Sequence, residues 1–142
     1  MRCGAVPDRL AWDSFLNGRG IDLVWSHSVF THMWPEDAVA NLKVLKDSCN
    51  PGAVMLHTWL ILDDFATAQL SQGTADRALP FEIGGIRTLS RTNPLDCTAY
   101  PLQLVEDVYS QSGVEVTDVL YGTWAGRDNG VTYIDMIVSR IP

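Results

Sequence analysis

The strongest pattern along the chain is a short apolar run, an amphipathic stretch and a second apolar run. Residues 21–25 and 54–62 are almost continuously apolar, which is typical of parallel strands buried on both faces. Between them, Pro35 suits the first position of a helix. Four residues then recur at the spacing of one helix face: Ala38, Leu42, Leu45 and Cys49. The pattern predicts a strand–helix–strand unit with a right-handed crossover over residues 21–62.

The remaining segments carry weaker signals. Residues 1–20 have no regular pattern and are expected to form an irregular lead-in. In residues 63–100, Asp63 or Asp64 could cap a short helix that ends at about Gln72. The Gly and Pro residues that follow predict a long, cap-like insertion, which at this length carries a function or structure of its own. Residues 101–142 predict an amphipathic helix, stopped by Gly113, and then an antiparallel pair of strands. We therefore expect a single domain over residues 1–142.

Composition and charge restrict the partners. The chain has 142 residues, of which 46% are hydrophobic and 19% charged, as in ordinary globular domains. The net charge is −7 and the sequence holds no cluster of Lys and Arg. Nucleic acids and anionic membrane surfaces need a positive footprint, so neither is expected as a partner. The longest apolar stretch, residues 53–62, is also too short to cross a bilayer. Small neutral or cationic ligands remain open.

The spacing of the cysteine and histidine residues indicates the cellular compartment and whether a metal site is present. Cys3, Cys49 and Cys97 are far apart and form no CxxC pair, which predicts free thiols and a cytoplasmic protein. His27 and His32 are five positions apart without a third ligand nearby, so no metal site is expected.

Three segments resemble parts of one known family. DLVWSHSVFTHM, which begins at Asp22, resembles the fourth strand and following loop of class I S-adenosylmethionine-dependent methyltransferases. LKVLKDSCNPGAVMLHT, from Leu42, resembles their next helix and fifth strand. YGTWAGRDNGVTYIDMIVSR, from Tyr121, resembles the ending of one branch of the family. Together the three segments lie in the family's order between residues 20 and 142.

The resemblance implies an α/β fold with part of a Rossmann-like methyltransferase sheet. The family orders its strands 3-2-1-4-5-7-6, and this chain would supply the strands equivalent to 4-5-7-6, with helices mainly on one face. The family binds its cofactor with a glycine-rich GxGxG loop after the first strand. No such loop precedes residue 21. The chain is therefore expected to be a truncated copy that holds the carboxyl-terminal half.

Two functions follow from this expectation. The first is an S-adenosylmethionine-dependent methyltransferase that acts on a small molecule when the missing amino-terminal half complements it. The alternative is a catalytically inactive, methyltransferase-derived scaffold or auxiliary subunit that self-associates.

The resemblance and the residue types together suggest site residues. Ser26, His27 and Ser28 follow the first strand, and the resemblance implies that they touch the methionine part of S-adenosylmethionine; capping the next helix is the other interpretation. Asp63 and Asp64 follow the second strand and are either a general base or helix N-caps. Four further residues are candidates for substrate binding, with core packing or solvent exposure as their alternatives: Trp59, Arg87, Trp124 and Arg127.

The first strand has a second implication. If the preceding strands of the family are missing, residues 21–25 form an apolar sheet edge that invites pairing with another chain. We expect a homodimer or a complementing subunit at the edge Ile21–Trp25, unless residues 1–20 or 63–100 fold over the bare face.

Overall fold

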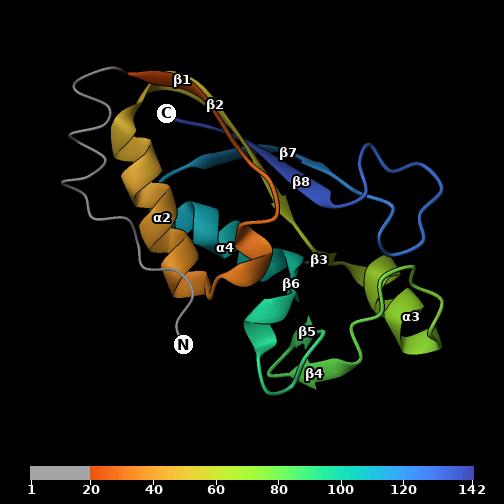
Figure 1. Cartoon of the computed structure of the whole chain (residues 1–142). Coiled ribbons are helices and arrows are strands. Elements are labelled where there is room, and N and C mark those ends of the chain that lie inside the picture. The colour runs from red at the N-terminus through yellow and green to blue at the C-terminus, as the bar shows by residue number, and fades with distance from the viewer. Residues whose placement is uncertain (1–19) are drawn as a thin grey trace.

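The computed structural model describes residues 20–142, so the lead-in expected over residues 1–20 lies outside the described residues except for Gly20. In chain order the elements are β1 (Ile21–Ser26), the 3₁₀ turn η1 (Phe30–His32), α2 (Pro35–Ser48), β2 (Cys49–Trp59), β3 (Ile61–Leu62), α3 (Asp64–Gln72), β4 (Phe81–Ile83), β5 (Ile86–Thr88), the 3₁₀ turn η2 (Pro94–Asp96), β6 (Thr98–Pro101), α4 (Leu102–Ser112), β7 (Glu115–Leu120) and β8 (Asp135–Arg140) (Figure 1).

The main sheet has the strand order β1-β2-β8-β7. β1 and β2 are parallel, with Leu23 opposite Val54 and Trp25 opposite Leu56. β8 is antiparallel to both of its neighbours. This is the order 4-5-7-6 that the resemblance implied, and the predicted strand–helix–strand unit and terminal antiparallel pair are both confirmed.

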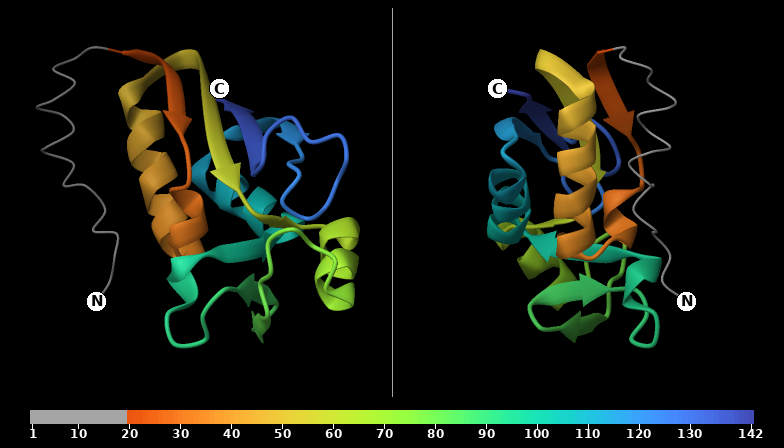
Figure 2. Two further views of the ribbon diagram at one scale, coloured as in Figure 1. Left: turned by 45° about the vertical axis from the view of Figure 1, so that its right-hand side comes forward. Right: turned by 90° about the vertical axis from the view of Figure 1, so that its left-hand side faces the viewer.

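Both long helices cover one face of this sheet. α2 begins at Pro35 with Glu36 and Asp37 in its first turn, where acidic side chains favour the positive helix end. α4 ends at Gly113, which adopts the left-handed conformation that glycine tolerates. Figure 2 shows α2 and α4 side by side, and the hydroxyl of Ser112 in α4 donates a hydrogen bond to the Val39 carbonyl of α2 at 3.4 Å.

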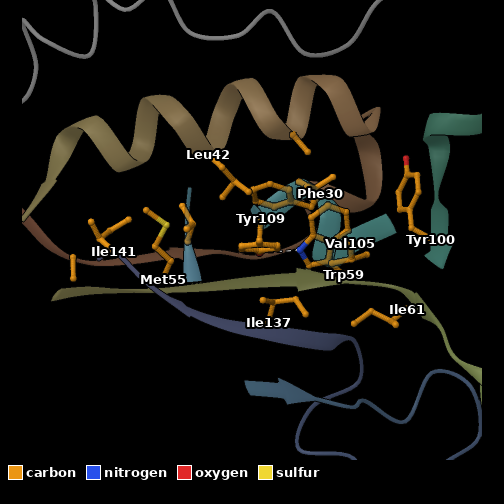
Figure 3. Packing of buried hydrophobic residues seen from close by; sticks show 14 of the residues in the cluster. Phe30, Leu42, Met55, Trp59, Ile61, Tyr100, Val105, Tyr109, Ile137 and Ile141 are labelled. Carbon is orange, nitrogen blue, oxygen red and sulfur yellow. Dashed lines mark hydrogen bonds between the residues drawn. The ribbon is translucent and has the colours of Figure 1, made fainter. Parts of the chain in front are cut away.

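The first hydrophobic core fills the space between these helices and the sheet. Leu42 of α2 and Met55 of β2 are fully buried there, together with Tyr109 of α4 and Ile137 of β8 (Figure 3). Truncating a fully buried Leu or Met to Ala costs about 2–5 kcal/mol, so this layer contributes a large part of the stability.

A polar chain crosses the same core. The Trp59 indole N–H donates to the Tyr109 hydroxyl at 3.1 Å, and that hydroxyl lies 3.1 Å from Nδ1 of His57. Because the hydroxyl accepts from Trp59, its own proton is directed at His57, so Nδ1 accepts and Nε2 carries the proton of the neutral ring. Burial lowers the pKa of His57 to about 4.

The second sheet was not foreseen. A strand predicted to run from Val54 to Leu62 instead leaves the main sheet after Trp59, where β8 begins opposite it. Beyond that point the chain pairs with β6, and the Tyr100 N–H donates to the Leu60 carbonyl. The second sheet has the order β3-β6-β5-β4 and lies beneath the main sheet in Figure 1. The insertion expected over residues 63–100 therefore carries structure of its own.

The other face of the main sheet carries apolar side chains at the surface. Leu23 is 61% exposed and Trp25 is 68% exposed, while Val54, Leu56 and Val138 beside them are half-buried. The strand pairing places Trp25, Leu56 and Val138 in one row across the sheet. Among the described residues, no strand pairs with the outer edge of β1.

We expect His57 to make the fold sensitive to acid. Its pKa is lower in the folded chain than the ordinary 6.5, so the unfolded chain binds more protons as pH falls from about 6.5 to 4. Stability is full above about pH 6.5 and decreases by about 2 kcal/mol between about pH 7 and 4.5. Urea denaturation at both pH values measures this loss. His57→Gln should reduce it and His32→Gln, at an exposed position, should not; an equal loss in all three proteins would contradict the assignment.

Candidate functional site

The carboxyl edge of the main sheet gathers most of the predicted residues. β7 is antiparallel to β8, which is antiparallel to β2, so β1, β2 and β7 all end at the same edge. The segments that follow these strands are residues 27–29, residues 60–63, which include the short strand β3, and residues 121–134. Ligands of open α/β sheets bind outside the carboxyl ends of the strands, which makes this edge the candidate site.

Ser28 turns the chain sharply at the end of β1. Its φ is +56°, and it is the one non-glycine residue with a positive φ in the part of the chain that the structure describes. The Ser28 N–H donates to the Thr58 hydroxyl of β2 at 2.8 Å, and the Ser28 hydroxyl lies 3.0 Å from Nδ1 of His27. A non-glycine residue with this backbone conformation is strained, and such strain is common at ligand-binding loops. The bond to Thr58 fixes the turn against the neighbouring strand.

Ser26 and His27 differ in their surroundings. The Ser26 hydroxyl is buried and has no hydrogen-bond partner within residues 20–142. Buried polar atoms are almost always bonded, so this hydroxyl marks a position where a ligand would complete a hydrogen bond. The His27 side chain is exposed. The structure therefore brings Ser26, His27 and Ser28 together at the sheet edge; cofactor binding by them stays a prediction.

Arg127 is held in a clamp on the same edge. Its guanidinium lies between two aromatic rings, 4.3 Å from the centroid of Phe65 and 4.4 Å from that of Tyr121. It also pairs with the carboxylate of Asp63. Cation–π contacts and a partly buried ion pair orient the guanidinium, so the arm that follows β7 is fixed to the start of α3. Arg127 is therefore held by protein contacts rather than solvated, and substrate binding by it stays a prediction.

The two acidic candidates have different environments. Asp63 is the N-cap of α3, and its carboxylate accepts from the Ala66 N–H at 2.9 Å besides pairing with Arg127. Asp64 is exposed in the first turn of the helix. The capping interpretation of Asp63 is therefore satisfied by geometry, while proton transfer by either residue stays a prediction.

The aromatic candidates lie in the two cores. Trp59 packs in the first core against Phe30, with ring centroids 4.9 Å apart. Trp124 is 1% exposed in a second core, which is formed by Leu60, Ala66, Leu79, Cys97, Ala99, Trp124 and Ala125. Both indole N–H groups donate to protein acceptors. The structure thus gives each tryptophan a packing role, and substrate contact by either stays a prediction.

Asp135 is the residue that sequence reasoning missed. Its carboxylate is 1% exposed and accepts three N–H groups: from the Ile61 backbone at 2.7 Å, the Gly122 backbone at 2.7 Å and the Trp124 indole at 2.6 Å. Burial raises the pKa of Asp135, and these three bonds and the charge of Arg127 oppose the shift. A usable signal was the tail itself, in which Gly122, Trp124 and Asp135 all occur.

Close backbone contacts shape the arm of residues 121–134. A Cβ on Gly122 would lie 2.4 Å from the Tyr133 carbonyl oxygen, so only glycine fits there. The Thr123 N–H donates to the Thr132 carbonyl and the Trp124 N–H to the Tyr133 carbonyl, which closes the arm on itself. The arm is therefore an ordered part of the edge.

Arg87 lies apart from these residues, in the hairpin of β4 and β5. It faces Glu82 across the hairpin, with Nε 3.8 Å from the carboxylate. A pocket of about 240 Å³ opens between this hairpin and α3. The pocket lining includes Arg87 but not Arg127, and substrate binding by Arg87 stays a prediction.

Residues 20–142 contain no group of three His, Cys, Asp or Glu side chains that could hold a metal ion. None of their helices has the length and apolar character that a membrane crossing requires.

Comparison with known proteins identifies the fold. No protein-family model matches the chain. An S-adenosylmethionine-dependent methyltransferase from Methanosarcina mazei aligns with a TM-score of 0.55 at 10% identity, over 84% of this chain and 58% of its own. An O-methyltransferase family 2 protein from Planctomyces limnophilus, solved in complex with apigenin, aligns at 0.52 and 11% identity, over 85% and 30%. The glycopeptide N-methyltransferase MtfA, solved with sinefungin, aligns at 0.52 and 14% identity, over 88% and 55%.

The strand order and these likenesses define the fold as that of the class I S-adenosylmethionine-dependent methyltransferases, so the fold expected from the three motifs is confirmed. The chain spans between 30% and 58% of the length of the three structures described.

Replacing Asp135 tests its structural role. In Asp135→Asn the amide cannot accept all three N–H groups, so at least one buried donor loses its partner, at a cost of about 1–3 kcal/mol. We expect a lower free energy of unfolding in urea by about that amount. Asp128→Asn, at an exposed position of the same arm, is the matched control and should leave it unchanged. Equal stability of the two variants would show that the carboxylate is dispensable.

Proposed function

We propose that the chain is the carboxyl-terminal half of an S-adenosylmethionine-dependent methyltransferase domain that acts on a small molecule. In this proposal the sheet is continued across β1 by strands that carry the glycine-rich loop. The observation that carries it is the order β1-β2-β8-β7, which ends at β1 with an unpaired edge among the described residues. The exposed side chains of Leu23 and Trp25 make this edge strand apolar, which supports the presence of a further strand beside β1.

The loop after β1 fits one wall of a cofactor site. Ser26 offers a buried hydroxyl without a partner, and Ser28 is already fixed to Thr58, so the wall is rigid before a ligand arrives. The cofactor, when bound, supplies an activated methyl group. The residues of this chain would hold its polar end by Ser26 and keep the neighbouring loop in place; methyl transfer itself depends chiefly on alignment and on exclusion of water.

A base, where the methyl acceptor must lose a proton, would come from the start of α3. The Asp63 carboxylate is held by Ala66 and Arg127, whereas Asp64 is exposed and free to meet a ligand. We therefore place Asp64 before Asp63 in this role.

The second candidate function is a non-catalytic scaffold or auxiliary subunit that self-associates. The apolar row formed by Trp25, Leu56 and Val138 favours it, because exposed apolar surface of this kind marks interaction sites. Without a complementing chain, the same surface would meet its own copy.

Titration with S-adenosylmethionine separates the two functions. The chain alone should bind the cofactor weakly, with a dissociation constant in the millimolar range, and NMR shifts should be confined to residues 26–28 and their neighbours. Ser26→Ala should weaken binding up to about tenfold because it removes one neutral hydrogen bond. The variant loses no protein hydrogen bond, so it should fold normally.

Ser110→Ala, at an exposed position of α4, is the control for this titration and should bind as the unmodified chain does. An absence of shifts near Ser26 at millimolar cofactor would overturn the assignment of the wall and favour the scaffold. Submicromolar binding by the chain alone would overturn the need for a continued sheet.

Self-association tests the exposed face. We expect the isolated chain to form dimers at tens of micromolar or above, measured by light scattering coupled to size exclusion. Trp25→Glu should shift it to monomer, because it replaces the most exposed side chain of the apolar row with a charge. Leu89→Glu, at an exposed apolar residue of the second sheet's outer loop, should leave the dimer intact. A monodisperse monomer at high concentration contradicts the homodimer.

A further inference from the structure

The pocket between α3 and the β4–β5 hairpin is built around one arginine. Leu62 of β3 and Pro101 of β6, which pair with each other, form the apolar part of its lining. Its walls combine hydroxyl groups of α3 with charged side chains of the hairpin. The lining residues are Leu62, Thr67, Ser71, Glu82, Gly85, Arg87 and Pro101.

The backbone holds Arg87 toward this pocket. Its neighbours Ile86 and Thr88 are buried on the opposite face of the hairpin, and the alternation of a strand turns Arg87 the other way. The side chain is only 19% exposed. An arginine buried to this extent keeps little freedom, so its donors are already oriented.

Most of the guanidinium donors have no acceptor. The ion pair with Glu82 runs through Nε at 3.8 Å, and the Glu82 side chain is 65% exposed. Neither terminal nitrogen of Arg87 has a hydrogen-bond partner within residues 20–142. Two parallel N–H groups in this fork match the two oxygens of a carboxylate.

We propose that this pocket binds the carboxylate of a small molecule through the terminal nitrogens of Arg87, with the apolar part of the ligand on Leu62 and Pro101. The volume of about 240 Å³ lies below the range of drug-sized pockets, which suits a ligand of about one ring. In the proposed methyltransferase the pocket would hold the methyl acceptor, and this role rests on the proposed function. The binding of a carboxylate by Arg87 does not depend on the proposed function.

The charges favour a carboxylate over a phosphate. Glu82 places one negative charge at the rim of the pocket, and the pocket lining holds one cation. A dianionic phosphate would be repelled more strongly than a monoanion and would lack a second cation.

The test is an NMR titration of the full chain with benzoate, benzamide and phenyl phosphate, without cofactor. Benzoate should give saturable shifts at the pocket residues, whereas benzamide, of the same shape but neutral, should bind at least fivefold more weakly. Arg87→Gln should weaken benzoate binding about tenfold. Arg91→Gln, an exposed arginine in the next loop, is the matched control and should not change it.

A third variant separates ligand binding from a merely structural ion pair. Glu82→Gln breaks the same pair but removes a repelling charge, so benzoate affinity should rise about threefold. If the pair only stabilised the hairpin, both variants would move binding in the same direction, which would overturn the proposal. Equal binding of benzoate and benzamide, no saturable shifts, or tighter binding of phenyl phosphate would overturn it as well. Because no cofactor is present, these outcomes are independent of methyl transfer.

Discussion

The structure depends on one buried carboxylate. Asp135 stands where β8 begins, and its three bonds reach β3, the start of the 121–134 arm and the indole of Trp124. It therefore ties the main sheet to the second sheet and the arm to both. Burial of a charge is costly, and three N–H donors are the compensation that makes it tolerable. Arg127 extends the same arrangement, because its clamp fixes the arm to α3.

The two faces of the main sheet have different consequences. The face under α2 and α4 is covered by a hydrophobic core next to the neutral His57, and the packing of this core contributes to the stability of the fold. The opposite face leaves Leu23 and Trp25 at the surface. We expect ligand binding at the carboxyl ends of β1, β2 and β7, where Ser26, Ser28 and Asp63 lie. The small pocket at Arg87 lies between α3 and the hairpin of the second sheet, and Leu62, which follows β2, is part of its lining.

The sequence predicted the elements whose signals are local. The helix from Pro35, the N-cap at Asp63 and the stop at Gly113 all depend on side chains within a few residues, and the structure has each of them. The end of β2 at Trp59 depends on where β8 begins, which no local pattern reveals. The short strands of the hairpin and the triple role of Asp135 likewise depend on residues distant in sequence. The sequence suggests Arg87 as a candidate for substrate binding, but its pocket follows only from the packing of α3 against the hairpin.

The edge of β1, which has no partner strand within residues 20–142, also restricts symmetry. Two copies related by a twofold axis present the same strand to each other, so they pair it antiparallel. A continuation of the methyltransferase sheet would instead add a parallel strand at that edge, because the family's neighbouring strand runs alongside β1. The two arrangements use the same row of backbone N–H and C=O groups and exclude each other. In the functions proposed above, a homodimer paired through β1 and a sheet continued by another chain would therefore exclude each other, and the concentration of the complementing strands would decide between them.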